Sequence, residues 1–287
     1  MRSGKISDIL LGALCSIAAL TGIGALIWIV TDLIQLGLPH LSPGFFTEEV
    51  TESGRGGGIG PILASTALIL LSCLTLAVPI GVGSALWFAE MITEKSRTGK
   101  LLTASIDLLA SVPSIVFGLF GMVFFCQVLG LGFSILAGGL TLACMVLPIV
   151  IRTTISAMRA IPQDLRPAAA ALGLSRTTTL GKILLPRALP GILVGVTISV
   201  ARALSETAAL IFTSGYATRW PGSLNDSGRA VSVHIYDLAM NIPNGAGRAS
   251  ASALVLLTLI LIINLTASFL SDRWFARQSA THPAING

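Results

Sequence analysis

Six long apolar segments constrain the fold of this chain more than any other feature of its sequence. Each is near or above the about 20 residues with which an α-helix crosses the hydrocarbon core of a bilayer. Only 11% of the residues are charged, against about 25% in soluble domains. The sequence therefore predicts an all-α, polytopic membrane protein with six transmembrane helices. The segments cover residues 9–36, 61–91, 101–129, 133–158, 190–213 and 249–270.

The first segment follows a short basic start that contains Arg2 and Lys5. A cleavable signal peptide has a shorter apolar core, of about 7–15 residues, followed by a small-residue cleavage site. We therefore expect residues 9–36 to stay in the protein as its first transmembrane helix.

Basic residues gather in the connections on one predicted side of the membrane. That side carries Arg2, Lys5, Lys95, Arg97, Lys100, Arg152, Arg159, Arg166, Arg176, Lys182, Arg187, Arg273 and Arg277. The other side carries Arg55, Arg219, Arg229 and Arg248, together with Glu48, Glu49 and Glu52. The positive-inside rule places both termini and the long fourth-to-fifth connection in the cytoplasm. This topology accounts for the formal net charge of +5, so we expect no nucleic-acid partner.

No catalytic motif is recognisable in the sequence. The glycine-rich stretch SGRGGGIG fits neither the dinucleotide-binding nor the phosphate-loop spacing. The histidines and cysteines are scattered, and none has paired metal-ligand spacing. They are His40, His234 and His282, and Cys15, Cys73, Cys126 and Cys144. We expect no catalytic residue, no metal site and no cofactor in this chain.

The long fourth-to-fifth connection reads AIPQDLRPAAAALGLSRTTTLGKILLPRALPGI. Asp164 as N-cap and Pro167 in the first turn predict a short alanine-rich helix that ends near Gly173. A second short helix is expected over residues 179–185 and is expected to end at Pro186. Such a pair of helices would form a small, mostly apolar knob in the cytoplasm that fits a groove on a partner protein.

The fifth apolar segment carries two charges, Arg202 and Glu206, four residues apart. On one helix they would face the same side and neutralise each other. A charge at this depth costs about 3 kcal/mol or more, and an apolar pair would be at least as stable, which favours a functional role over a purely structural pair. Arg152, at the end of the fourth segment, is either an interfacial anchor or a second cation on one polar substrate path. Guanidinium groups match the oxygens of phosphate.

Two further patterns bear on the shape of the helices. Pro79 and Pro113 predict bends in the second and third apolar segments. In the loop between the last two segments, Val231, Ile235 and Leu238 have helical spacing. They predict a short amphipathic helix on the outer surface.

The connection resembles the transmembrane permeases of bacterial ABC importers, whose signature is E-A-A-x-x-x-G followed after nine residues by I-x-L-P. The matching residues here are Pro167, Ala168, Ala169, Gly173, Ile183, Leu185 and Pro186. Pro167 replaces the glutamate of the signature. The resemblance implies a MetI-like fold, coupling helices in this loop that dock on ABC ATPase subunits inside the cell, and no ATP site in the permease itself.

Several other stretches are similar, in the same order, to phosphate-specific permeases of the PstA type. They include SVPSIVFGLFG, LPIVIRTTISAMRAIP and ARALSETAALIFTSG, and the similarity runs from about residue 56 to residue 265. This resemblance implies phosphate import across the bacterial cytoplasmic (inner) membrane. It also implies a homologous second permease and a phosphate-binding protein outside, and it assigns transport roles to the matching arginines and glutamate. Ser205 stands where glycine is more common in the family.

We expect three regions: residues 1–55 with the first helix and an outer loop, residues 56–275 as the permease core, and residues 276–287 as a short tail. Two alternatives stay open for the function. One is an ABC permease for another oxyanion or polar solute. The other is an ion-driven secondary transporter, which would show internal repeats; no convincing repeat is visible.

Overall fold

The computed structural model describes residues 2–92 and 96–281; Lys95 and residues 282–287 of the expected tail lie outside this range. The long and short α-helices are α1 (Arg2–Gly37), α2 (Gly60–Met91), α3 (Arg97–Ser111), α4 (Ser114–Gly121), α5 (Ile135–Arg159), α6 (Leu165–Ala171), α7 (Arg176–Thr179), α8 (Leu185–Leu204), α9 (Ala208–Ile211), α10 (Val231–Met240) and α11 (Ala246–Thr281). Between them lie the 3-10 helices η1 (Leu38–His40), η2 (Pro43–Phe46) and η3 (Glu52–Gly54), the π-helical turns η4 (Met122–Val128) and η5 (Leu180–Leu184), and the antiparallel strands β1 (Val50–Thr51) and β2 (Gly56–Gly57).

The helices confirm the predicted class of an all-α membrane protein. Five helices of the described residues are long and apolar enough to cross a membrane, and a bent helix pair makes a sixth crossing if it counts as one span. That pair is α3 with α4–η4, and the two parts meet at an angle of 92°. The predicted bend at Pro113 is thus present, and it is a break between two helices and not a kink within one. Pro113 has no N–H to donate and holds Val112 in an extended conformation, so the helix stops and restarts.

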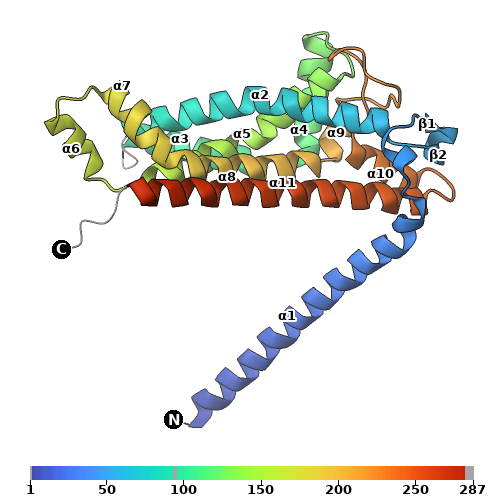
Figure 1. Cartoon of the computed structure of the whole chain (residues 1–287), viewed down its shortest axis with the longest axis horizontal. Helices are drawn as coiled ribbons and strands as arrows, with labels where there is room; N and C mark the ends of the chain where they lie inside the picture. Colours follow the sequence, from blue (N-terminus) through green and yellow to red (C-terminus); the bar gives the residue numbers. More distant parts are fainter. Residues whose placement is uncertain (1, 93–95, 282–287) are drawn as a thin grey trace.

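The helices α2, α5, α8 and α11 lie side by side in one bundle, with α6–α7 at one end and α10 at the other (Figure 1). The centre is α5, whose most apolar stretch is 67% buried. Small residues let its neighbours approach closely, as expected between transmembrane helices. A methyl group on Gly81 of α2 would lie 2.7 Å from Val150 of α5. We call the two ends the α6–α7 end and the α10 end.

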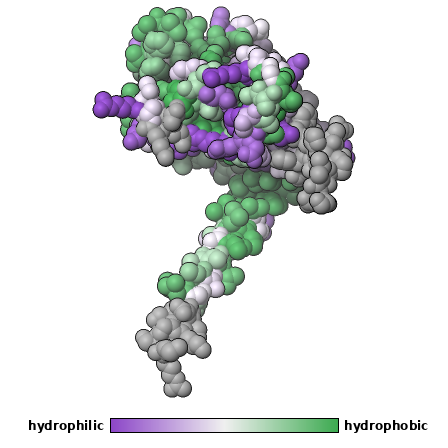
Figure 2. Space-filling view, turned by 90° about the vertical axis from the view of Figure 1, so that its left-hand side faces the viewer, coloured by the Kyte–Doolittle hydropathy of each residue, from purple (hydrophilic) through white to green (hydrophobic). Residues whose placement is uncertain are grey.

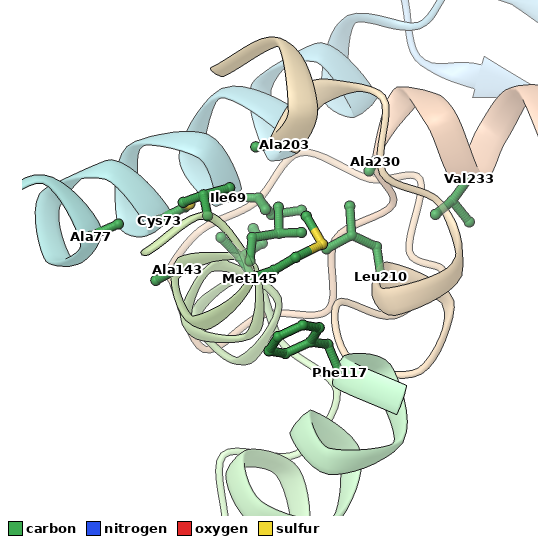
Figure 3. Packing of buried hydrophobic residues seen from close by; sticks show 13 residues of the cluster. Ile69, Cys73, Ala77, Phe117, Ala143, Met145, Ala203, Leu210, Ala230 and Val233 are labelled. Atoms are coloured by element: carbon green, nitrogen blue, oxygen red, sulfur yellow. The ribbon is translucent and has the colours of Figure 1, made fainter. Parts of the chain in front are cut away.

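The largest apolar cluster lies where α2, α4, α5 and α9 meet near the α10 end (Figure 3). Phe117 of α4 and Met145 of α5 are both buried there, and Leu210 of α9 packs against them. This packing anchors the short helices α4 and α9 to the central helix. It thereby fixes the chain segment that contains Glu206.

The first helix, α1, diverges from the bundle instead of packing along it (Figure 1). Its apolar stretch over Leu10–His40 is 0% buried, and side chains such as Leu14 and Trp28 are 68% and 75% exposed. Figure 2 shows α1 as a hydrophobic arm beside an α6–α7 end where hydrophilic residues gather. Close packing begins only at Gly37, where a methyl group would lie 2.8 Å from the backbone of Ala251 in α11.

Two expectations about residues 179–213 are wrong. The second short helix, expected over residues 179–185, does not end at Pro186, because a proline is tolerated in the first turn of α8 and the helical path runs from Arg176 to Leu204 through the π-turn η5. It also does not continue to residue 213. The helix stops at Leu204 and restarts as α9 at Ala208. The Ser205 hydroxyl donates to the carbonyl of Ala201, which favours a helix end at this point.

The predicted amphipathic helix is confirmed as α10, with Val231 and Leu238 fully buried. His234 on the same helix is 1% exposed. Arg229 donates to the Asp237 carboxylate at 2.9 Å, and its Nη1 lies 3.5 Å from Nδ1 of His234. Burial, together with the charges of Arg229 and Arg248, lowers the pKa of His234 to about 4, against a weaker opposing effect of Asp237. His234 is therefore neutral at physiological pH.

Candidate functional site

Arg202 and Glu206 form an ion pair, although they do not share one helix. Arg202 lies in the last turn of α8, and Glu206 lies in the break between α8 and α9. The Arg202 Nη2 and Glu206 Oε2 atoms are 3.9 Å apart, which is an electrostatic contact and not a hydrogen bond. The predicted pairing of the two charges is thus present, while the predicted i, i+4 position on a continuous helix is wrong.

The two partners differ in exposure. The Glu206 side chain is 6% exposed, and the Arg202 side chain is 50% exposed. The second carboxylate oxygen of Glu206 accepts the N–H of Ala209 at 3.2 Å, and the backbone carbonyl of Glu206 accepts the hydroxyl of Ser232. Glu206 is therefore a fixed, buried anion, and Arg202 is an accessible cation beside it.

Arg152 of α5 pairs with Asp107 of α3. Both side chains are about half exposed, at 51% and 46%. They line a cavity of about 290 Å³ between α2, α3 and α5. Its other lining residues are Phe88, Thr103, Ile106, Ile155, Ser156 and Arg159. Guanidinium and hydroxyl groups are the side chains that bind oxyanions in proteins.

Sequence reasoning missed Asp107. A signal was present, because an ionisable residue within an apolar segment marks a functional position by default. Asp107 is such a residue in the segment predicted over 101–129. Its partner could not be read from the sequence, since the contact depends on how α3 turns back toward α5.

The packing of α8 on α5 sets the distance between the two arginines. A methyl group on Gly191 would lie 2.6 Å from the side chain of Ala157, and Gly195 packs in the same way on Thr153. Because α5 and α8 run antiparallel, Arg152 lies level with Val196 of α8, one residue after Gly195. Arg202 lies six residues farther along α8. At 1.5 Å per residue, the two positions differ by about 9 Å along the bundle. Each arginine thus has its own carboxylate at its own level; we call these the Arg152 pair and the Arg202 pair.

The predicted docking residues lie at the α6–α7 end, in the hairpin of α6 and α7 and in the turns that lead from it into α8 (Figure 1). Gly173 ends α6 with a φ of +71°, a left-handed conformation that favours glycine. Asp164 occupies the N-cap of α6 but makes no side-chain capping bond there, whereas Ser175 caps α7 by accepting the N–H of Thr178. Leu172 between them is 78% exposed. In chain order, the predicted docking residues are Pro167, Ala168 and Ala169 in α6, Gly173 at its end, Ile183 in η5, and Leu185 and Pro186 in α8.

Residues 77–277 match the model of a family described as the binding-protein-dependent transport system inner membrane component. The chain belongs to this family. It is thus a multi-pass protein of the inner membrane and a component of a transport system, not itself an enzyme. Among the described residues, no cluster of His, Cys, Asp or Glu side chains has the arrangement of a metal site.

Individual relatives cover nearly the whole chain. A probable ABC transporter permease protein, YqgI of Bacillus subtilis (strain 168), is 31% identical over 96% of this chain and 99% of its own length. The phosphate transport system permease protein PstA of Xylella fastidiosa (strain Temecula1) is 33% identical over 88% of each chain.

A solved bacterial alginate ABC transporter, in complex with its alginate-bound periplasmic protein, has a similar fold. It has a TM-score of 0.67 and 18% identity over 93% of this chain and 95% of its own. At this identity the likeness concerns the fold alone. The family match and the relatives, together with this fold, make the chain an ABC importer permease subunit with the MetI-like fold of that class.

Proposed function

We propose that this permease moves inorganic phosphate across the bacterial cytoplasmic membrane, driven by ATP hydrolysis on a partner subunit. The observation that carries the proposal is the pair of half-exposed arginines at two levels of an apolar bundle, each beside a carboxylate. Guanidinium groups bind tetrahedral oxyanions well. The names of relatives such as the Xylella PstA support the same substrate class.

The carboxylates give the arginines a way to release their cargo. A site in a transport path has to bind its ion weakly enough for the ion to leave. In the proposed cycle, phosphate displaces Asp107 from Arg152 or Glu206 from Arg202, and the carboxylate returns when phosphate moves on. Because Glu206 is held by Ala209 and Ser232, Arg202 is the partner that moves at its level.

We propose a homologous second permease as the partner of α1. A 31-residue apolar stretch with 0% of its most hydrophobic window buried has a helical face free for another subunit, and α1 points away from its own bundle (Figure 1). The exposed hairpin of α6 and α7 would dock on an ABC ATPase subunit in the cytoplasm. The α10 end would face a phosphate-binding protein outside, in keeping with the expected cytoplasmic termini.

The test is ATP-dependent uptake of labelled phosphate by the purified complex in proteoliposomes, with sulfate and molybdate as competitors. We expect uptake that needs ATP and that tenfold excess sulfate leaves intact. Preferred uptake of sulfate, molybdate or another solute would show that this solute, and not phosphate, is the substrate. Uptake that runs on an ion gradient without ATP would contradict the ABC mechanism itself.

A further inference from the structure

An ion pair joins the docking hairpin to the end of α2. Arg166, the second residue of α6, donates from Nε and Nη2 to the same oxygen of Glu90, at 3.2 and 2.7 Å. Glu90 is the last residue but one of α2. The two side chains are 32% and 21% exposed, so the pair is partly shielded from solvent. Such a two-donor contact fixes direction as well as distance.

The rest of α6 is attached to the bundle by apolar packing. Leu165 packs against the apolar cluster of Met158, Leu184 and Ala188 on α5, η5 and α8, and Ala169 is buried. Val82, Leu86 and Ala89 of α2 pack against the same cluster. Beyond these contacts, a crevice of about 330 Å³ lies between the hairpin and the last residues of α2. Its lining residues are Glu90, Met91, Arg166, Ala170, Leu174, Arg176, Thr177, Thr179 and Leu180. The Arg166–Glu90 pair bridges this crevice at the end of α2.

The same end of α2 leads to the Arg152 pair. Phe88, two residues before Glu90, is buried against Ala85 and Ile155 and lines the cavity that holds Arg152 and Asp107. A displacement of α6 that pulls on Glu90 therefore acts on a wall of that cavity. Close packing of α2 on α5, as at Gly81 and Val150, lets the helices move as rigid elements instead of absorbing the displacement.

We propose that Arg166 and Glu90 are positioning residues that transmit the movement of the docking hairpin to α2 and so to the Arg152 pair. This inference rests on the proposed docking of α6 on an ATPase subunit. Arg166 directly precedes Pro167, the residue that stands where ABC permeases carry a glutamate. In this part of the hairpin, the charged residue is Arg166, and its partner is Glu90 on α2 of the same chain.

The experiment uses the whole complex in proteoliposomes and measures phosphate uptake and ATP hydrolysis side by side. Glu90→Gln and Arg166→Gln remove one charge each and keep a polar side chain, which at position 90 also has nearly the same shape. We expect the ATP hydrolysed per phosphate transported to rise about tenfold in each variant, since coupling energies between sites commonly correspond to factors of 5 to 150. The charge exchange Glu90→Arg with Arg166→Glu should restore the ratio in large part.

The control is Arg97→Gln, which removes an exposed charge at the same end of the bundle but lies outside the crevice. It should leave the ratio unchanged. If both glutamine variants lose uptake and ATP hydrolysis in equal proportion, the pair only stabilises the fold and the inference is overturned. If the variants do not assemble, the charge exchange decides: assembly with normal coupling supports the pair, and failure overturns it. Absence of any ATPase subunit with the unaltered chain would instead overturn the docking proposal, before the ion pair is tested.

Discussion

At the scale of single residues, the carboxylate of Glu206 makes two contacts, and a substitution by alanine would remove both at once. One oxygen lies near Arg202, and the other accepts the N–H of Ala209 at the start of α9. Loss of a capping contact costs about 1 kcal/mol, which affects folding. Loss of the charge next to Arg202 affects the proposed path. Variants that change one contact at a time are needed to separate the two.

Arg202→Ala and Glu206→Ala should each abolish phosphate uptake while membrane insertion and subunit assembly survive. Glu206→Gln should also stop uptake, although its amide oxygen can still accept the N–H of Ala209. Uptake in proteoliposomes and the amount of purified complex give the two readouts. If the alanine variants lose the assembled complex and Glu206→Gln transports normally, the pair is structural.

Asp107→Asn should slow phosphate release from Arg152. Without the competing carboxylate, the guanidinium holds the anion longer, so the half-saturation concentration and the maximal rate of uptake should both fall, by about tenfold. Unchanged kinetics in Asp107→Asn would remove the Arg152 pair from the path.

His234 should make the complex less stable in mild acid. The pKa of His234 is about 4 in the folded chain and 6.5 in the unfolded chain. Between these two values, the unfolded chain therefore binds a proton that the folded chain does not. Stability therefore falls as the pH drops from 6.5 toward 4, by roughly 2 kcal/mol at pH 5. Thermal denaturation of the detergent-solubilised complex at pH 7 and pH 5 should show this loss, and His234→Gln should flatten it. Equal losses in both proteins would assign the acid sensitivity to other groups.

At the scale of helices, close contact between α5 and α8 depends on glycine. Gly195→Val should destabilise the complex by about 1–3 kcal/mol through overpacking against Thr153, and Thr153→Ala should restore part of the loss. Gly83→Ala is the control, because nothing lies within 4 Å of the added methyl group. Melting temperatures of the four proteins test this register, and no difference between Gly195→Val and Gly83→Ala would contradict it.

The helices themselves were largely predictable from apolar length, and their breaks were not. Residues 61–91 and 133–158 coincide closely with α2 and α5, and residues 249–270 lie within the longer α11, because a helix satisfies its own backbone hydrogen bonds in lipid. The stop at Leu204 coincides instead with the contacts of Glu206, whose side chain accepts the N–H of Ala209 and whose carbonyl accepts the hydroxyl of Ser232 in α10. For the same reason Arg202 and Arg152 could be chosen from the sequence, but Asp107 could not be matched with Arg152 before α3 was placed.

At the scale of the whole molecule, α1 gives a direct test of the second permease. A photoreactive amino acid at Trp28, which is 75% exposed, should cross-link to the partner permease in the assembled complex. The same group at Ile59, which is 1% exposed in the bundle, should give adducts only within the chain. Lipid adducts alone from position 28 would show that α1 faces the bilayer and not another subunit.

The carboxylate beside each arginine also determines the net charge on which the membrane potential acts. With Arg152 and Arg202 each balanced by a carboxylate, the empty pairs carry no net charge, and in the proposed transport of phosphate the charge that crosses is that of the anion. An inside-negative potential of 100 mV opposes each entering negative charge by about 2.3 kcal/mol. A doubly charged phosphate therefore meets an electrical barrier of about 4.6 kcal/mol, in addition to any concentration gradient. A neutral path of this kind leaves that work to ATP.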